Sequence, residues 1–131
     1  MKGPVVALLC IVAAAFAACK EEPKPGELAA KAAVKGYGHL IAGRYADYLA
    51  GVAGVDSLPA AYREQLLAGA KQFMARQREE HGGIARVSVV KYVADSVARQ
   101  TNVFLLLCFG DSTREEVVVP MVEGPSGWRM K

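Results

Sequence analysis

The pattern of apolar residues changes at Gly82-Gly83, and this change most constrains the fold. Residues 27–81 are rich in alanine and leucine at helical spacing, whereas residues 84–123 consist of valine-rich runs. A helix buries one stripe of side chains and a sheet buries one face, so the two kinds of segment must cover each other. The sequence therefore predicts an α+β domain with its helices first and its sheet after them.

Three helices are expected, over residues 27–42, 44–52 and 59–81. Glu27 stands where the positive end of the first helix favours a negative charge, and Pro59 fits the first turn of the third helix. One stripe of the third helix is expected to face inward: Tyr62, Leu66, Ala70, Phe73, Met74 and Gln77.

Four antiparallel strands are expected, over residues 84–97, 101–109 and 113–123, with a last strand that contains Trp128 and Met130. Short turns between the runs are typical of a meander. In the first strand, Val87 and Val89 share one face, but Val90 and Tyr92 occupy the other. A slip of one residue in a strict alternation indicates a β-bulge, which bends the sheet.

The strand at 101–109 is apolar on both faces. Leu105 and Leu107 point one way, and Phe104 and Leu106 point the other. Strands of this kind are usually covered on both sides. The helices supply one cover, so we expect a second copy of the chain to supply the other, in a homodimer formed through the sheet.

The first residues have the features of an export signal. The apolar run from Val5 to Ala18 is shorter than the roughly 20 residues that a bilayer-spanning helix needs, and it has the length of a signal-peptide core. The charges and the proline that follow at residues 20–23 cannot extend a span. Residues 1–18 are therefore predicted to be a cleaved signal peptide.

The end of this run, Phe16-Ala17-Ala18-Cys19, resembles the bacterial lipoprotein box. That resemblance implies that Cys19 carries a diacylglyceryl group and a fatty acid such as palmitate, and becomes the first residue of the mature chain. The alternative is an ordinary signal cleavage near Ala18 that leaves a free thiol on Cys19.

The next residues, Lys20, Glu21 and Glu22, resemble a tag that sends lipoproteins to the outer face of the cell in one Gram-negative phylum. The resemblance implies an outer-membrane anchor at the cell surface, and the alternative is an anchor that faces the periplasm. Residues 19–26 also read as a polar, proline-containing tether, because such stretches stay extended in water.

From residue 27 to 131 the chain resembles the nuclear transport factor 2-like, or cystatin-like, superfamily. It is most similar to small bacterial lipoproteins of unknown function that are related to lumazine-binding-like domains. Five segments carry the likeness: residues 40–45, Leu58-Pro59, residues 110–113, residues 119–122 and residues 127–130. The resemblance implies three helices packed on a curved four-stranded sheet, with a conical pocket between them.

Some members of that superfamily are isomerases or dehydratases that use Asp, His and Tyr in the pocket. The resemblance therefore implies that residues of these types could line a pocket in this chain. The residues expected to line a pocket are Tyr37, Tyr62, Tyr92, Asp95 and Phe104. Asp95 shares strand parity with Val87 and Val89, and a carboxylate in an apolar pocket can act as a base. An enzyme of this type, built on Asp95 with Tyr37 and Tyr92, is the alternative hypothesis.

The leading hypothesis is a lipid-anchored binding or interaction module without catalysis, cofactor or metal. His39 is expected off the inner face of its helix, and His81 at a helix end. No histidine, cysteine or aspartate has the spacing of metal ligands. The formal net charge of +3 is too small to indicate a nucleic-acid partner.

Overall fold

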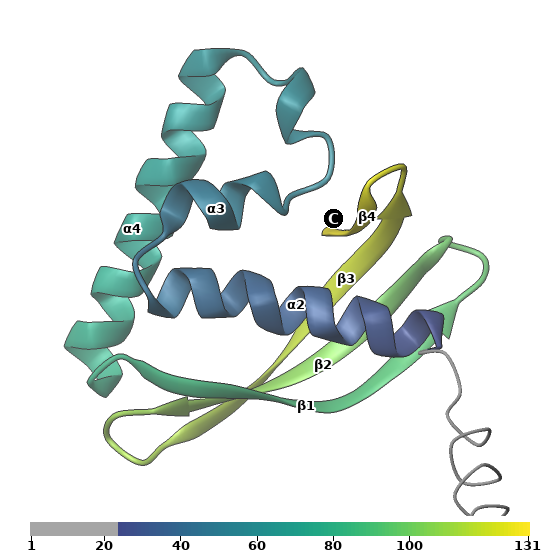
Figure 1. The fold of residues 1–131 in the computed structure, drawn as a ribbon. Coiled ribbons are helices and arrows are strands. Elements are labelled where there is room, and N and C mark those ends of the chain that lie inside the picture. The colour runs from purple at the N-terminus through teal and green to yellow at the C-terminus, as the bar shows by residue number, and fades with distance from the viewer. Residues whose placement is uncertain (1–23) are drawn as a thin grey trace, which may run out of the picture.

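The computed structural model describes residues 24–131 as three α-helices followed by a four-stranded sheet (Figure 1). The helices are α2 (Pro25–Ile41), α3 (Tyr45–Ala50) and α4 (Ala60–His81), with a 3-10 turn, η1 (Val55–Ser57), before α4. The strands are β1 (Ile84–Asp95), β2 (Gln100–Phe109), β3 (Arg114–Gly124) and β4 (Gly127–Met130). The predicted α+β class and element order are confirmed.

The sheet is an antiparallel meander in which the strands follow one another in chain order, β1-β2-β3-β4. Helix α2 lies across one face of this sheet and contacts all four strands. It begins at Pro25, two residues before the expected start, because proline is tolerated at the first helical position. The signal peptide, Cys19 and the tag at residues 20–22 lie outside the described residues.

The core is formed where α2 meets β2 and β3. Ala29 and Ala33 of α2 are fully buried against Val103 and Leu105 of β2. The small alanine side chains allow the helix to approach the sheet closely, and the larger strand residues fill the remaining volume. Along β2, every residue of one parity from Thr101 to Phe109 is buried. This row therefore fixes which face of the sheet is covered.

The predicted bulge in β1 is present, and it changes which face the rest of the strand uses. Val89 pairs with Leu105 and Lys91 pairs with Phe104, so Val90 is the extra residue. Beyond the bulge, Tyr92 returns to the helix-covered face. The same shift places Asp95 opposite Gln100, in the row of Phe104 on the other face. The expected shared face of Asp95 and Val87 is therefore wrong.

Helix α4 packs by its second half. Met74 is its one buried residue in the structure, whereas Leu66 is 37% exposed and Tyr62 is 56% exposed. Figure 1 shows the first half of α4 rising past α3, away from the sheet. The expected inner stripe is thus wrong at Tyr62, because no strand reaches the start of this helix.

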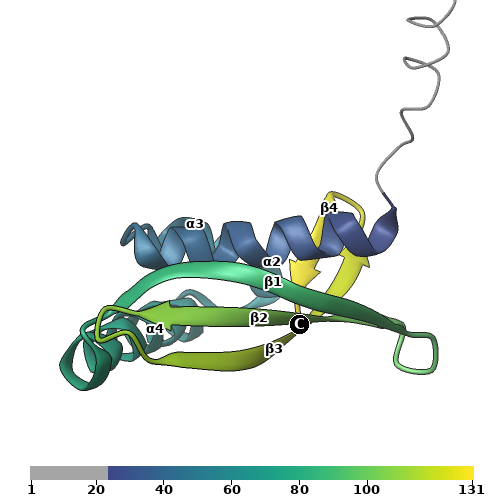
Figure 2. The ribbon, with the colours of Figure 1, turned by 90° about the horizontal axis from the view of Figure 1, so that it is seen from below.

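The second face of the sheet is open. In Figure 2, which views the molecule from below, the helices α2 and α3 lie on one side of the strands, above them in the picture. Val90, Val93 and Val118 are each about half exposed there, and Phe104 and Leu106 are half-buried. Among the described residues, no helix has the length and apolarity needed to cross a membrane.

Candidate ligand cavity

A cavity of about 410 Å³ lies between the three helices and the last strand. Its lining is mostly apolar and is drawn from α2, α3, α4 and the end of the chain: Tyr37, Leu40, Tyr48, Leu49, Val52, Gln65, Leu66, Gly69, Ala70, Phe73, Met130 and Lys131. Pockets that hold small molecules have volumes of roughly 300–1,000 Å³ and linings of this kind. The cavity therefore has the size and character of a small-molecule site.

Backbone contacts hold the walls of this cavity in place. Gly43, with φ of 76°, allows the chain to reverse between α2 and α3. After α3, the backbone N–H of Met130 donates to the carbonyl of Gly51 at 2.8 Å, and the N–H of Ala53 donates to the carbonyl of Met130 at 2.7 Å. These bonds attach the end of α3 to β4, so Tyr48 is held beside the sheet.

Two phenols lie among the polar groups of the cavity, beside Gln65 and Lys131. Burial raises the pKa of Tyr37, and the neighbouring Tyr48 and Glu115 raise it further. Burial alone raises the pKa of Tyr48. No hydrogen bond from a described residue affects the pKa of either hydroxyl. Both hydroxyls are therefore neutral near pH 7 and available to donate to a ligand.

Of the five residues expected to line a pocket, Tyr37 lines this cavity. Tyr62 is exposed on the first turn of α4, beyond the cavity wall. Tyr92 lies at the opposite end of α2, where its ring contacts Gly26. Phe104 lies on the open face of the sheet, where the Lys91 ammonium is 4.7 Å from the centre of its ring.

Asp95 lies at the turn between β1 and β2 rather than in the cavity. Its carboxylate accepts hydrogen bonds from the backbone N–H groups of Val97 and Ala98, each at 3.1 Å. An aspartate whose carboxylate accepts hydrogen bonds from the backbone N–H groups two and three residues later stabilises a turn. The expected place of Asp95 in a pocket depended on strict alternation of side chains along β1. The extra residue at Val90 breaks that alternation.

Comparison with known proteins gives one solved structure. No protein-family model matches the chain, and no curated protein matches it. The solved structure is a protein from Campylobacter jejuni named "Putative NTF2-like transpeptidase", with a TM-score of 0.60 at 9% sequence identity. The match covers 75% of this chain and 92% of that chain.

The fold is nuclear transport factor 2-like. At 9% identity the likeness concerns the fold alone. In this nuclear transport factor 2-like domain the cavity lies between the helices and the last strand, β4.

Sequence reasoning missed most of the cavity wall. Tyr48 was readable as a member of a short helix, but its place opposite Tyr37 depends on the Gly43 turn. Met130 was assigned correctly to the last strand, yet its second partner, Val52, pairs with it through an isolated bridge. A single-residue bridge leaves no periodic signal in the sequence, so no pattern could have indicated it.

The two histidines lie away from the cavity. His39 accepts a hydrogen bond from Arg44 at 3.3 Å. His81 stacks on Phe109, and its Nδ1 lies 3.3 Å from the Asp111 carboxylate. Hydrogen bonds from Thr113, with a smaller effect of His81, lower the pKa of Asp111. Between residues 24 and 131, no three His, Cys, Asp or Glu side chains form a group that could hold a metal ion.

Proposed function

We propose that this protein is a lipid-anchored lipoprotein of the cell envelope, whose domain binds a small ligand without catalysis. The observation that carries the proposal is the cavity between the helices and β4, with two phenol hydroxyls on a mostly apolar wall. The export signal and the lipoprotein box supply the proposed location. The outer membrane, at the cell surface, is the proposed site of the anchor.

The lining favours a particular class of ligand. Leu40, Leu49 and Phe73 would contact a hydrocarbon or aromatic body, and burial of such a body is favourable at about 25 cal/mol per Å². Tyr37 and Tyr48 would each donate a hydrogen bond to an oxygen or nitrogen of the ligand. The proposed ligand is thus a small, mainly apolar molecule with one or two acceptor atoms.

Catalysis is not proposed, because the groups of the alternative hypothesis are far apart in the fold. Tyr37 lines the cavity, Tyr92 lies at the start of α2, and Asp95 caps a turn. A transpeptidase activity, as named for the structural neighbour, would require a nucleophile in the cavity. The described thiol, Cys108, is buried in the row of Phe104 on the other side of β2.

A leucine at Gly69 tests the cavity. Gly69 lines it from α4, and a Cβ at this position would meet no atom within 4 Å. Gly69→Leu should therefore fill the cavity and also favour the helix by several tenths of a kcal/mol or more. We expect binding of the neutral fluorescent probe N-phenyl-1-naphthylamine to fall at least tenfold, measured by titration of a chain that begins at residue 20.

Gly38→Leu is the matched control, because Gly38 also has open space around its Cβ position but does not line the cavity. The chain from residue 20 suits the test since every core residue lies between Ala29 and Met130. Equal probe binding by the Gly69 and Gly38 variants would contradict the proposed site.

We also propose that two copies associate through the open face of the sheet. Phe104, Leu106 and Val118 form an apolar strip there. Lys91 on β1 and Glu116 on β3 flank the strip, so a two-fold axis along β2 brings each lysine toward the partner's glutamate. Three strands of about ten residues give a face of roughly 30 by 15 Å, near the lower limit of about 1,000 Å² in total for a specific interface.

Val118→Lys tests the dimer. Val118 is 51% exposed in a single chain, so a lysine there leaves the monomer folded but places two new charges in a shared apolar interface. We expect the dissociation constant to rise at least tenfold, measured by sedimentation equilibrium. Tyr62→Lys, which alters an exposed aromatic residue on α4, should leave it unchanged. A monomeric wild-type chain at the highest concentration would refute the association.

A further inference from the structure

A second hollow lies on the other side of Met130 from the ligand cavity. It has a volume of about 530 Å³ and is bounded by α2, by the end of α3 and by the β3–β4 hairpin. Its polar lining differs from that of the cavity: Lys35, His39, Asp47, Ser126, Trp128 and Arg129. The groups that could donate hydrogen bonds come from α2 and from the β3–β4 hairpin, which are far apart in the sequence, so only the folded chain brings them together.

Arg129 is held in place by two hydrogen bonds. Its Nη1 donates to the carbonyl oxygen of Ala50 at 3.1 Å, and its Nη2 lies 3.2 Å from the Ser126 hydroxyl. The side chain is 28% exposed. A guanidinium has five N–H donors in a fixed plane, so two such contacts hold the plane and leave other donors free. A guanidinium held in this way suits a carboxylate or a phosphate.

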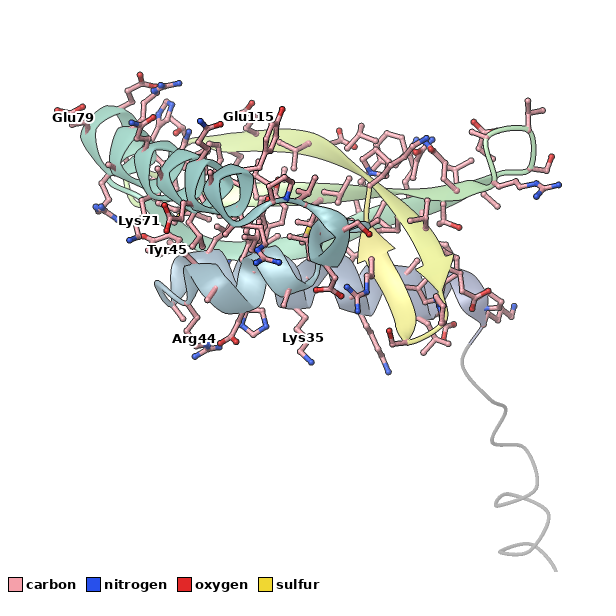
Figure 3. The ribbon with its side chains drawn as sticks, turned by 90° about the horizontal axis from the view of Figure 1, so that it is seen from above. Lys35, Arg44, Tyr45, Lys71, Glu79 and Glu115 are labelled. Atoms are coloured by element: carbon pink, nitrogen blue, oxygen red, sulfur yellow. The ribbon has the colours of Figure 1, made fainter. Side chains whose placement is uncertain are left out.

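Lys35 and Trp128 add to the positive and donor character of the hollow. Lys35 lies on the exposed face of α2, and Figure 3 shows it extending from the same side of the molecule as Arg44. The indole Nε1 of Trp128 is buried and has no hydrogen-bond partner among residues 24–131. A buried donor without a partner costs free energy, so a bound acceptor within its reach would remove a cost.

Two carboxylates lie near these cations without neutralising them. Asp47 forms an ion pair with Arg44, with 3.8 Å between its carboxylate oxygen Oδ2 and the guanidinium Nε. Asp56 lies 3.9 Å from Arg129, but its side chain is 88% exposed, and solvent-exposed pairs contribute little. The lining holds two cations, Lys35 and Arg129, against the carboxylate of Asp47, so the net charge of the hollow is positive.

We propose that this hollow binds the oxyanion of a small organic ligand, either a carboxylate or a phosphate ester. Arg129 and Lys35 would hold the charged oxygens, and the Trp128 ring and Met130 would contact the hydrocarbon part. This site is independent of the tyrosine-lined cavity, because it has different donors and lies on the other side of Met130.

The single tryptophan of the chain makes the proposal directly measurable. Because Trp128 lines the hollow, its fluorescence and the NMR signal of its indole N–H respond to binding there. Trp128 also lines a smaller hollow beside Asp95, and the Lys35 and Arg129 variants separate the two places because neither residue lines that second hollow. Inorganic phosphate and acetate are the probes, titrated separately into the chain from residue 20, with sodium chloride keeping the ionic strength constant. We expect a saturable change with at least one of them, and the more effective probe identifies the class of ligand.

Lys35→Gln and Arg129→Gln should each weaken that binding about tenfold, the usual effect of one charge-assisted hydrogen bond. Lys31→Gln removes a charge one turn earlier on α2, outside the hollow, and should leave binding unchanged. Arg129 also supports the end of α3, so Lys35→Gln serves as the variant without a structural role. No saturable response to either probe, or equal weakening by Lys31→Gln, would overturn the proposal.

Discussion

Leu105→Ala is expected to lower the free energy of unfolding by about 3–5 kcal/mol. Leu105 is fully buried at the centre of β2, between Val89 of β1 and Val117 of β3, and it packs in the cluster formed with α2. Truncation of a buried leucine removes its transfer free energy and leaves a cavity that rigid neighbours cannot refill. Both neighbouring strands and the helix constrain this position, so the loss should lie in the upper part of that range.

Urea unfolding of the chain from residue 20, followed by far-UV circular dichroism, measures this effect. Val97→Ala is the control, because Val97 is 95% exposed in the β1–β2 turn and should change stability by less than about 0.5 kcal/mol. A loss below 1 kcal/mol for Leu105→Ala would mean that β2 is not the centre of the core.

Cys19→Ala is expected to abolish the incorporation of labelled palmitate and to release the protein from membranes. The thiolate of this cysteine is the proposed nucleophile for the diacylglyceryl group, and alanine has no sulfur to replace it. Each buried methylene contributes about 0.8 kcal/mol to anchoring, and stable attachment takes more than one acyl chain. Loss of the acyl chains should therefore move the protein entirely to the soluble fraction.

Cys10→Ala provides the matched control, because Cys10 lies within the proposed signal peptide and is removed with it. Labelling and membrane retention should equal those of the wild type. If the Cys19 variant still incorporates labelled palmitate, or stays in the membrane fraction like the wild type, the lipoprotein assignment is wrong.

The fold was predictable because each element has a local signal. The switch at Gly82-Gly83 separated helices from strands, and Pro25, Pro59 and the turn at residues 110–112 marked boundaries within two residues of those observed. The phase slip around Val90 indicated the bulge, since only one extra residue can restore the alternation of the strand.

The site was less predictable, because it depends on contacts between distant segments. Val90 was recognised as part of a bulge, but Asp95 and Tyr92 were still assigned to the faces that an unbroken strand would give them. Tyr62 has the spacing of an inner residue, yet the start of α4 extends beyond the sheet. No pattern in the sequence indicated that Arg129 would line a hollow, because its hydrogen bonds to Ala50 and Ser126 depend on how β4 packs against α3.

The proposal of a binding module can be tested most directly by native mass spectrometry of the protein purified from its own cells, with its ligand still bound. The account predicts a non-covalent adduct of a few hundred daltons on the wild type and on Gly38→Leu, and no adduct on Gly69→Leu. An adduct of the same mass and occupancy on the Gly69 variant, or bare protein in all three samples, would contradict it.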